Sequence, residues 1–120
     1  MAIMSYGRRI TQMAELDPER AAVTCGGTTL TRQQLEQRAN RLAHDFLERG
    51  VELGDMVTIA LPNSTDWYVA MAACWKVGAV PQPVSAKLPA RELQAILELA
   101  DPKLVVGVSD DLTEGRPALP

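Results

Sequence analysis

Few residues in this 120-residue sequence combine the type and the spacing that a reactive site requires. The best phosphate-binding candidate is Gly26-Gly27-Thr28-Thr29, but phosphate-binding loops need a helix directly after them and usually a lysine. A run of β-forming residues follows here, so we interpret the glycine pair as a hairpin turn. His44, the single histidine, falls opposite the apolar side of a predicted helix and is expected to be solvated.

The cysteines and tryptophans also lack the arrangement of a catalytic centre. Cys25 and Cys74 stand in no metal-binding or redox spacing, which is typical of reduced thiols. Trp67 and Trp75 belong to a predicted apolar helix, and that setting favours a role in the core over a ligand platform. The residues alone therefore assign no catalytic residue, no nucleotide-binding residue and no metal ligand.

Composition narrows the classes of partner. The net charge is -3 and the arginines are scattered, which argues against nucleic acid or an anionic membrane as the main partner. No apolar run approaches the roughly 18 residues that a membrane span needs, and the first residues have no secretory signal pattern. We therefore expect one cytoplasmic domain with a core of its own.

The segment from Met71 to Ser85 predicts the end of a buried helix followed by a strand. Gly78 stands where a helix needs a residue that accepts positive φ. Pro81 and Pro83 exclude helix from the residues before them, and their missing N–H groups keep the strand from being central along its whole length. The carboxyl end of such a strand lies where open α/β sheets bind ligands, although a simple edge strand is an equally weighted alternative. The substrate-side candidates are Pro83, Val84, Ser85 and Lys87.

A long helix is predicted from Thr31 to Arg49. Thr31 and Gln34 have the spacing of a capping box, and Leu30 with Leu35 that of a hydrophobic staple. Gly50 is the expected stop. The expected buried stripe consists of Leu35, Ala39, Leu42, Ala43, Phe46 and Leu47.

The remaining pattern predicts an α/β fold. A helix at 5–16 and a short hairpin at 21–30 precede the long helix, and from residue 56 to 108 the order is strand, helix, strand, helix, strand. The apolar strands indicate a parallel sheet with helices on both faces. Lys76 is expected at the solvent edge of its helix. We predict a partial domain over residues 1–108 and a loop or truncated linker over residues 109–120, including Asp110 and Asp111.

Two core motifs and two further segments, in the right order and spacing, resemble the adenylate-forming superfamily of acyl-CoA synthetases, peptide-synthetase adenylation domains and luciferases. The core motifs are Thr29-Leu30-Thr31 with Gln34-Leu35 before the helix to Gly50-Val51, and Trp75-Lys76-Val77-Gly78-Ala79-Val80-Pro81 with Pro83-Val84. The further segments are Ile59-Ala60-Leu61-Pro62-Asn63-Ser64 and Ala100-Asp101-Pro102-Lys103-Leu104-Val105-Val106. The form of residues 81–85 is more similar to acyl-CoA synthetases, and faintly to those acting on steroid or bile acids.

The resemblance implies two-step chemistry. A carboxylic acid attacks the α-phosphate of ATP, with Mg²⁺, to give an acyl-adenylate, and a thiol such as coenzyme A then takes the acyl group. The family's phosphate loop with its lysine and its later motifs are not in this sequence. The chain is thus expected to be an amino-terminal part of the large domain, inactive alone, with the rest of the polypeptide as partner. The motif residues with chiefly structural roles are Thr31, Gln34, Leu35, Gly50, Gly78 and Pro81.

Two alternatives remain open from the sequence. One is a self-standing flavodoxin-like α/β module that binds a nucleotide or another ligand. The other is the same region of an adenylation domain that loads a carrier-protein thiol. A partial domain also predicts an exposed apolar sheet edge at Leu104–Val108, and with it self-association.

Overall fold

The computed structural model describes residues 5–109, 112–113 and 117–119 of the chain. Asp110 and Asp111 lie outside the described residues. The elements, in chain order, are α1 (Tyr6–Leu16), β1 (Ala21–Cys25), β2 (Thr28–Thr31), α2 (Arg32–Glu48), β3 (Met56–Ile59), α3 (Thr65–Val77), β4 (Val80–Pro83), α4 (Ala90–Ala100), β5 (Leu104–Val106) and β6 (Ala118–Leu119).

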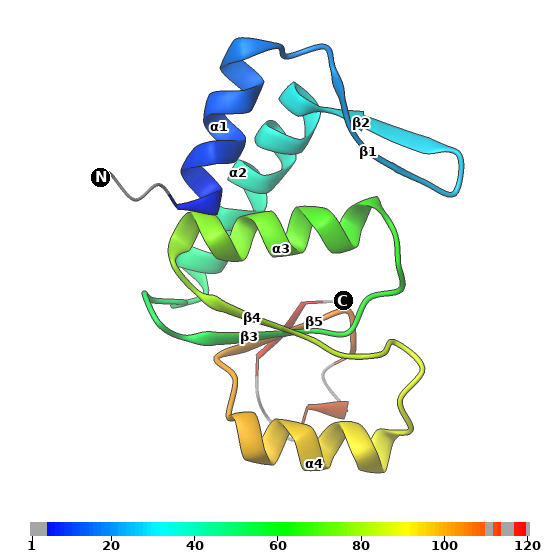
Figure 1. Cartoon of the computed structure of the whole chain (residues 1–120). Coiled ribbons are helices and arrows are strands. Elements are labelled where there is room, and N and C mark those ends of the chain that lie inside the picture. Colours follow the sequence, from blue (N-terminus) through cyan, green and yellow to red (C-terminus); the bar gives the residue numbers. More distant parts are fainter. Residues whose placement is uncertain (1–4, 110–111, 114–116, 120) are drawn as a thin grey trace.

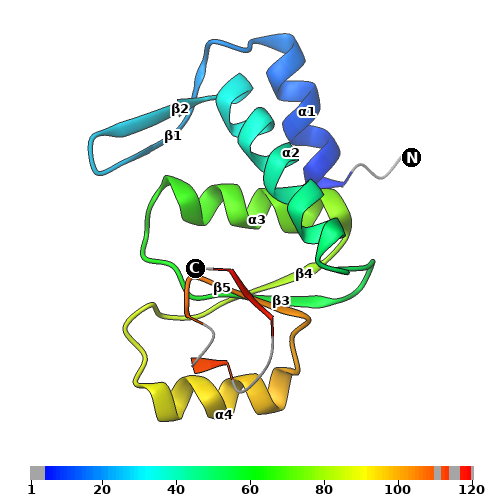
Figure 2. The same ribbon diagram turned by 180° about the vertical axis from the view of Figure 1, so that it is seen from behind.

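The described strands form the antiparallel β1–β2 hairpin and a four-stranded sheet with the order β4-β3-β5-β6. β3 pairs in parallel with β4 and β5, and β5 pairs in parallel with β6. Helices α2 and α3 lie on one face of the sheet, α1 packs against both, and α4 covers the opposite face (Figures 1 and 2). The predicted α/β class, with a parallel sheet between helices, is confirmed.

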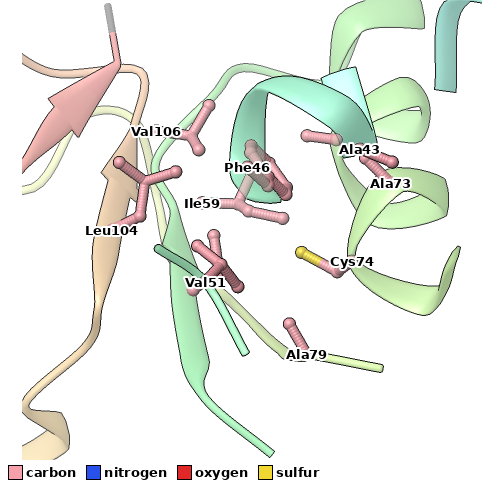
Figure 3. Packing of buried hydrophobic residues seen from close by; sticks show 11 residues of the cluster. Ala43, Phe46, Val51, Ile59, Ala73, Cys74, Ala79, Leu104 and Val106 are labelled. Atoms are coloured by element: carbon pink, nitrogen blue, oxygen red, sulfur yellow. The ribbon is translucent and has the colours of Figure 1, made fainter. Parts of the chain in front are cut away.

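Each face of the sheet has its own core, because successive strand residues point to opposite sides. The cluster under α2 and α3 (Figure 3) includes Ala43, Phe46, Val57, Ile59, Cys74, Leu104 and Val106. On the other face, Val105 packs against Leu93 and Leu97 of α4. The short strand β5 thus contributes side chains to both cores and connects the two helical layers.

Local signals set the ends of the helices. At the start of α2, the Gln34 N–H donates to Thr31 Oγ1 at 3.1 Å, and the Thr31 N–H donates to Gln34 Oε1 at 2.9 Å. This reciprocal pair is the capping box that the sequence indicates. Gly78 closes α3 with φ +76°, a left-handed conformation that glycine adopts without the cost that a Cβ would bring.

The predicted stripe of α2 is too wide by one residue. Ala39, Ala43 and Phe46 are buried, whereas the Leu47 side chain is 53% exposed. At about 100° per residue, Leu47 lies about 80° around the helix from Ala39, and Phe46 only about 20°. Leu47 is therefore on the flank of the stripe and faces solvent.

The carboxyl-terminal part of the sheet differs from the prediction. The sequence predicts an exposed edge at Leu104, Val105 and Val106. In the structure, β5 is paired on both sides and these residues are at most 4% exposed. The cause is β6, a strand of two residues within the segment predicted as loop. The prediction of an exposed apolar edge at β5 is therefore wrong. The division of the chain at residue 108 stays a prediction.

Candidate functional site

The four substrate-side candidates lie at the end of β4: Pro83 is the last residue of the strand, and Val84, Ser85 and Lys87 are in the loop that follows it. The Val84 N–H donates to the Ile59 carbonyl at 2.9 Å, and the Val84 side chain packs half-buried against the α4 core. The Ser85 hydroxyl accepts from the Lys87 N–H at 3.2 Å. Pro83, Ser85 and Lys87 are exposed. The loop therefore presents a hydroxyl and an ammonium group at the carboxyl edge of the sheet, and its part in substrate binding stays a prediction.

A groove of about 550 Å³ opens elsewhere along the same edge. It lies between α2, the start of α3 and the carboxyl ends of β3, β5 and β6. Its apolar lining is Leu42, Leu61, Val69, Ala70, Val106 and Leu119, and its charged lining is Arg38, Arg41, Asp45 and Asp66. None of the four predicted substrate-side residues lines it, so this surface was missed by reasoning from the sequence.

The backbone closes the space between the ends of β3 and β5. The Ala60 N–H donates to the Val106 carbonyl at 2.8 Å, and the Gly107 N–H donates to the Leu119 carbonyl at 2.7 Å. Gly107 has φ +95°, and a Cβ at this position would lie 2.6 Å from the Ala60 carbonyl oxygen. Strand ends of this kind often border a ligand crevice, but here they are in direct contact. Any ligand at this edge must bind beside them.

A buried polar cluster joins α1, α2 and α3, and it corrects the position predicted for its lysine. Lys76 is expected at the solvent edge, yet its side chain is 11% exposed. Lys76 Nζ donates to Glu36 Oε1 at 2.7 Å, to Glu36 Oε2 at 2.9 Å and to Thr11 Oγ1 at 2.8 Å. The three ammonium protons are thus all used, which makes the burial of this charge tolerable.

Glu36 receives further donors. Thr11 Oγ1 donates to Glu36 Oε1 at 2.7 Å, and Asn40 Nδ2 donates to the same oxygen at 3.0 Å. Burial alone would raise the pKa of Glu36, but the hydrogen bonds from Lys76, Thr11 and Asn40 outweigh it and hold the pKa below its ordinary value. No local pattern in the sequence indicates this cluster, because Glu36 and Lys76 are 40 positions apart along the chain.

Three other kinds of group could take part in chemistry: a metal-binding cluster, the single histidine and a thiol. Over residues 5–109, 112–113 and 117–119, no group of three or more His, Cys, Asp or Glu side chains could hold a metal ion. His44 is exposed, as predicted. Burial raises the pKa of the Cys74 thiol to about 12, so it is not a thiolate at neutral pH. Within the same described part of the chain, no helix is long and apolar enough to cross a membrane.

The fold and the sequence together define a family. The model of the AMP-binding enzyme family matches residues 10–119, which is nearly the whole chain. The chain therefore belongs to the AMP-binding enzymes. Membership of this family replaces the flavodoxin-like alternative, and the family's name implies that its members use an adenine nucleotide.

Relatives come from two branches of the family. The chain is 42% identical over 87 residues to a 3-oxocholest-4-en-26-oate–CoA ligase of Rhodococcus rhodochrous, covering 72% of this chain and 16% of the relative. It is 33% identical over 104 residues to a dimodular nonribosomal peptide synthase of Bacillus subtilis, covering 87% of this chain and 4% of that protein.

A solved structure agrees with this placement. The N-terminal subdomain of Klebsiella oxytoca NpsA, in complex with anthranilyl-AMSN, has a TM-score of 0.82 and 25% identity to this chain. The similarity covers 97% of this chain and 31% of the NpsA subdomain. The chain thus corresponds to part of the N-terminal region of much longer relatives.

Proposed function

We propose that this chain is the amino-terminal part of an ATP-dependent carboxylic acid:CoA ligase, in which it forms the scaffold beside the reacting groups. The observation that carries the proposal is the 42% identity to a steroid-acid CoA ligase. The proposed reaction uses ATP, Mg²⁺ and coenzyme A, and the proposed location is the cytoplasm.

The proposed substrate is a hydrophobic carboxylic acid of the steroid side-chain or fatty-acid class. The support is the substrate in the name of the Rhodococcus relative, 3-oxocholest-4-en-26-oate. Pro83, Val84, Ser85 and Lys87 are proposed to face the substrate side. The rest of the polypeptide is proposed to cover the groove beside α2, since the apolar part of its lining is surface that a longer chain would bury.

A second candidate is an adenylation domain that loads the thiol of a carrier protein. The 33% identity to the dimodular nonribosomal peptide synthase favours it. The two candidates share the first step and differ in the acceptor of the acyl group. They are separated by supplying the parent polypeptide with acid, ATP and either coenzyme A or a phosphopantetheinylated carrier protein.

A segment exchange tests the main proposal. The matching segment of the Rhodococcus ligase is replaced by the corresponding residues of this chain, and AMP release is followed with 3-oxocholest-4-en-26-oate and coenzyme A. We expect the hybrid to keep activity within about tenfold of the parent ligase, since the segment supplies scaffold and not reacting groups. The matched control is the ligase with the same segment deleted, which is expected to be inactive.

The isolated chain tests whether this segment has activity of its own. We expect residues 1–120 to show no acid-dependent ATP–pyrophosphate exchange above background. Exchange by the isolated chain would contradict the scaffold role. A folded but inactive hybrid would contradict the ligase assignment.

A further inference from the structure

The outer side of β4 has an unusual set of backbone groups. Among the described strands, β4 is at the edge of the sheet and pairs only with β3. The Val80 N–H donates to the Asp55 carbonyl at 2.8 Å, and the Val84 N–H donates to the Ile59 carbonyl at 2.9 Å. In a parallel pair, alternate residues bond to the same neighbour. Residues 80, 82 and 84 therefore face β3, and residues 81 and 83 face outward.

Both outward positions are proline. Pro81 and Pro83 have carbonyl groups on this side but no N–H groups. A strand that paired here would find acceptors for its own N–H groups and no donors for its carbonyls. The outer edge of β4 therefore lacks half of the hydrogen bonds that a sheet edge normally offers.

Packing alone does not explain the proline at position 83, whereas Pro81 is half-buried. Pro83 is exposed, so its ring is not needed to fill a core. The neighbouring Val80 is 47% exposed, which adds an apolar side chain to an accessible strand edge. An exposed edge with an apolar side chain is a common starting point for pairing between copies of a protein.

We infer that Pro81 and Pro83 close the outer edge of β4 to strand addition, so that a second copy of this chain cannot extend the sheet from this side. The interaction surface at β4 excludes β-strands because it has acceptors only. Self-association of the sheet, where it occurs, takes place at another surface. This inference does not depend on the proposed ligase function.

The test restores the missing donors. In the double variant Pro81→Val/Pro83→Val, valine keeps an apolar, strand-forming side chain and supplies two outward N–H groups. Sedimentation velocity over a concentration series compares self-association with the parent chain. We expect association of the double variant to be roughly tenfold tighter, because two net hydrogen bonds are gained per added strand. Pro83→Val alone, at the exposed position, is expected to give a smaller shift in the same direction.

The control changes prolines that are not on a sheet edge. Pro62 and Pro89 are exposed loop residues, and Pro62→Val/Pro89→Val alters composition equally without adding an edge donor. A synthetic peptide of residues 79–85 with valine at 81 and 83 is a second probe, expected to bind the edge variant and not the parent chain. Equal self-association of the parent, the edge variants and the loop variant would overturn the inference, as would equal binding of the peptide.

Discussion

Lys76 and Glu36 show how single side chains fix the arrangement of three helices. The ion pair joins α3 to α2, and Thr11 of α1 bonds to both charged groups. Gly7 of α1 allows this contact, because a Cβ at Gly7 would lie 2.9 Å from Lys76 Cα. We expect a buried ion pair of this kind to select one packing arrangement more than to add stability, since desolvation offsets much of its attraction.

Removing the carboxylate is expected to destabilise the fold. Glu36→Gln leaves the Lys76 ammonium buried without a counter-charge, and we expect a loss of about 3 kcal/mol in the free energy of unfolding at pH 7. Urea unfolding measures it. The matched control on the same helix is Asp45→Asn, which breaks the half-exposed pair with Arg49 and is expected to cost at most about 0.5 kcal/mol. Equal losses in the two variants would contradict a special role for the buried pair.

The pH dependence of this difference has a defined sign. The pKa of Glu36 in the folded chain lies below its ordinary value of 4.5. The carboxylate therefore contributes its stability above pH 4.5 and loses it as pH falls through the lower folded pKa. The gap between the parent chain and Glu36→Gln is expected to be constant from pH 7 to pH 5 and to shrink at lower pH. A gap that widens on acidification would be the contrary result.

Features of single residues could be predicted from the sequence where the residues involved are close together along the chain. The capping box needs only Thr31 and Gln34, which are three positions apart, and the sequence shows both. The partners of Lys76 are 40 and 65 positions away along the chain. Helical periodicity says which side of α3 a residue is on, but not that α1 will pack across that side. The burial of Lys76 was therefore out of reach of local patterns.

At the scale of elements, the contact between the ends of β3 and β5 shapes the carboxyl edge of the sheet. Gly107 lets the two backbones touch, and no residue of the loop after β4 lines the groove beside α2. The two surfaces are therefore distinct parts of one edge.

Gly107→Ala tests that contact. We expect a loss of roughly 3 kcal/mol, because the methyl group meets the Ala60 carbonyl and the backbone has positive φ. The control is Gly27→Ala in the hairpin, where φ is +82° but nothing lies within 4 Å of the added Cβ; its expected loss is about 1 kcal/mol. Thermal and urea unfolding report both. Similar losses would show that conformation alone, without the close approach, sets the cost at Gly107.

The longer elements could be predicted and the shortest could not. Helices α2 and α3 have long apolar patterns with stop glycines, so their positions follow from local sequence. β6 has two residues, too few for any period, and it is a strand only because β5 offers an edge to it. The groove could not be predicted either, since its lining comes from α2, α3, β5, β6 and the loop residue Leu61, which meet only in the fold.

At the scale of the whole molecule, the sheet connects two cores that share no helix. Leu97 lies in the core on the α4 side, and both tryptophans are on α3, on the other side. Leu97→Ala is expected to cost about 3 kcal/mol, because it leaves a cavity at a fully buried position. If the two cores unfold together, tryptophan fluorescence and far-UV circular dichroism will report the same lowered midpoint.

Leu99→Ala, at a residue of α4 that is 89% exposed, is the matched control and is expected to leave both midpoints in place. A tryptophan transition that keeps the parent midpoint while the dichroism signal becomes biphasic would show that the two layers unfold separately.

The corner at Thr31 has a mechanical consequence. Thr31 is the last residue of β2 and also the residue that caps α2, and the Arg32 N–H donates to the Arg20 carbonyl at 2.8 Å. No linker separates the projecting hairpin from the helix (Figure 1). We therefore expect the hairpin and α2 to move together as one unit. We expect a displacement of the hairpin to be passed along α2 toward Phe46, which lies in the core between α2 and the sheet.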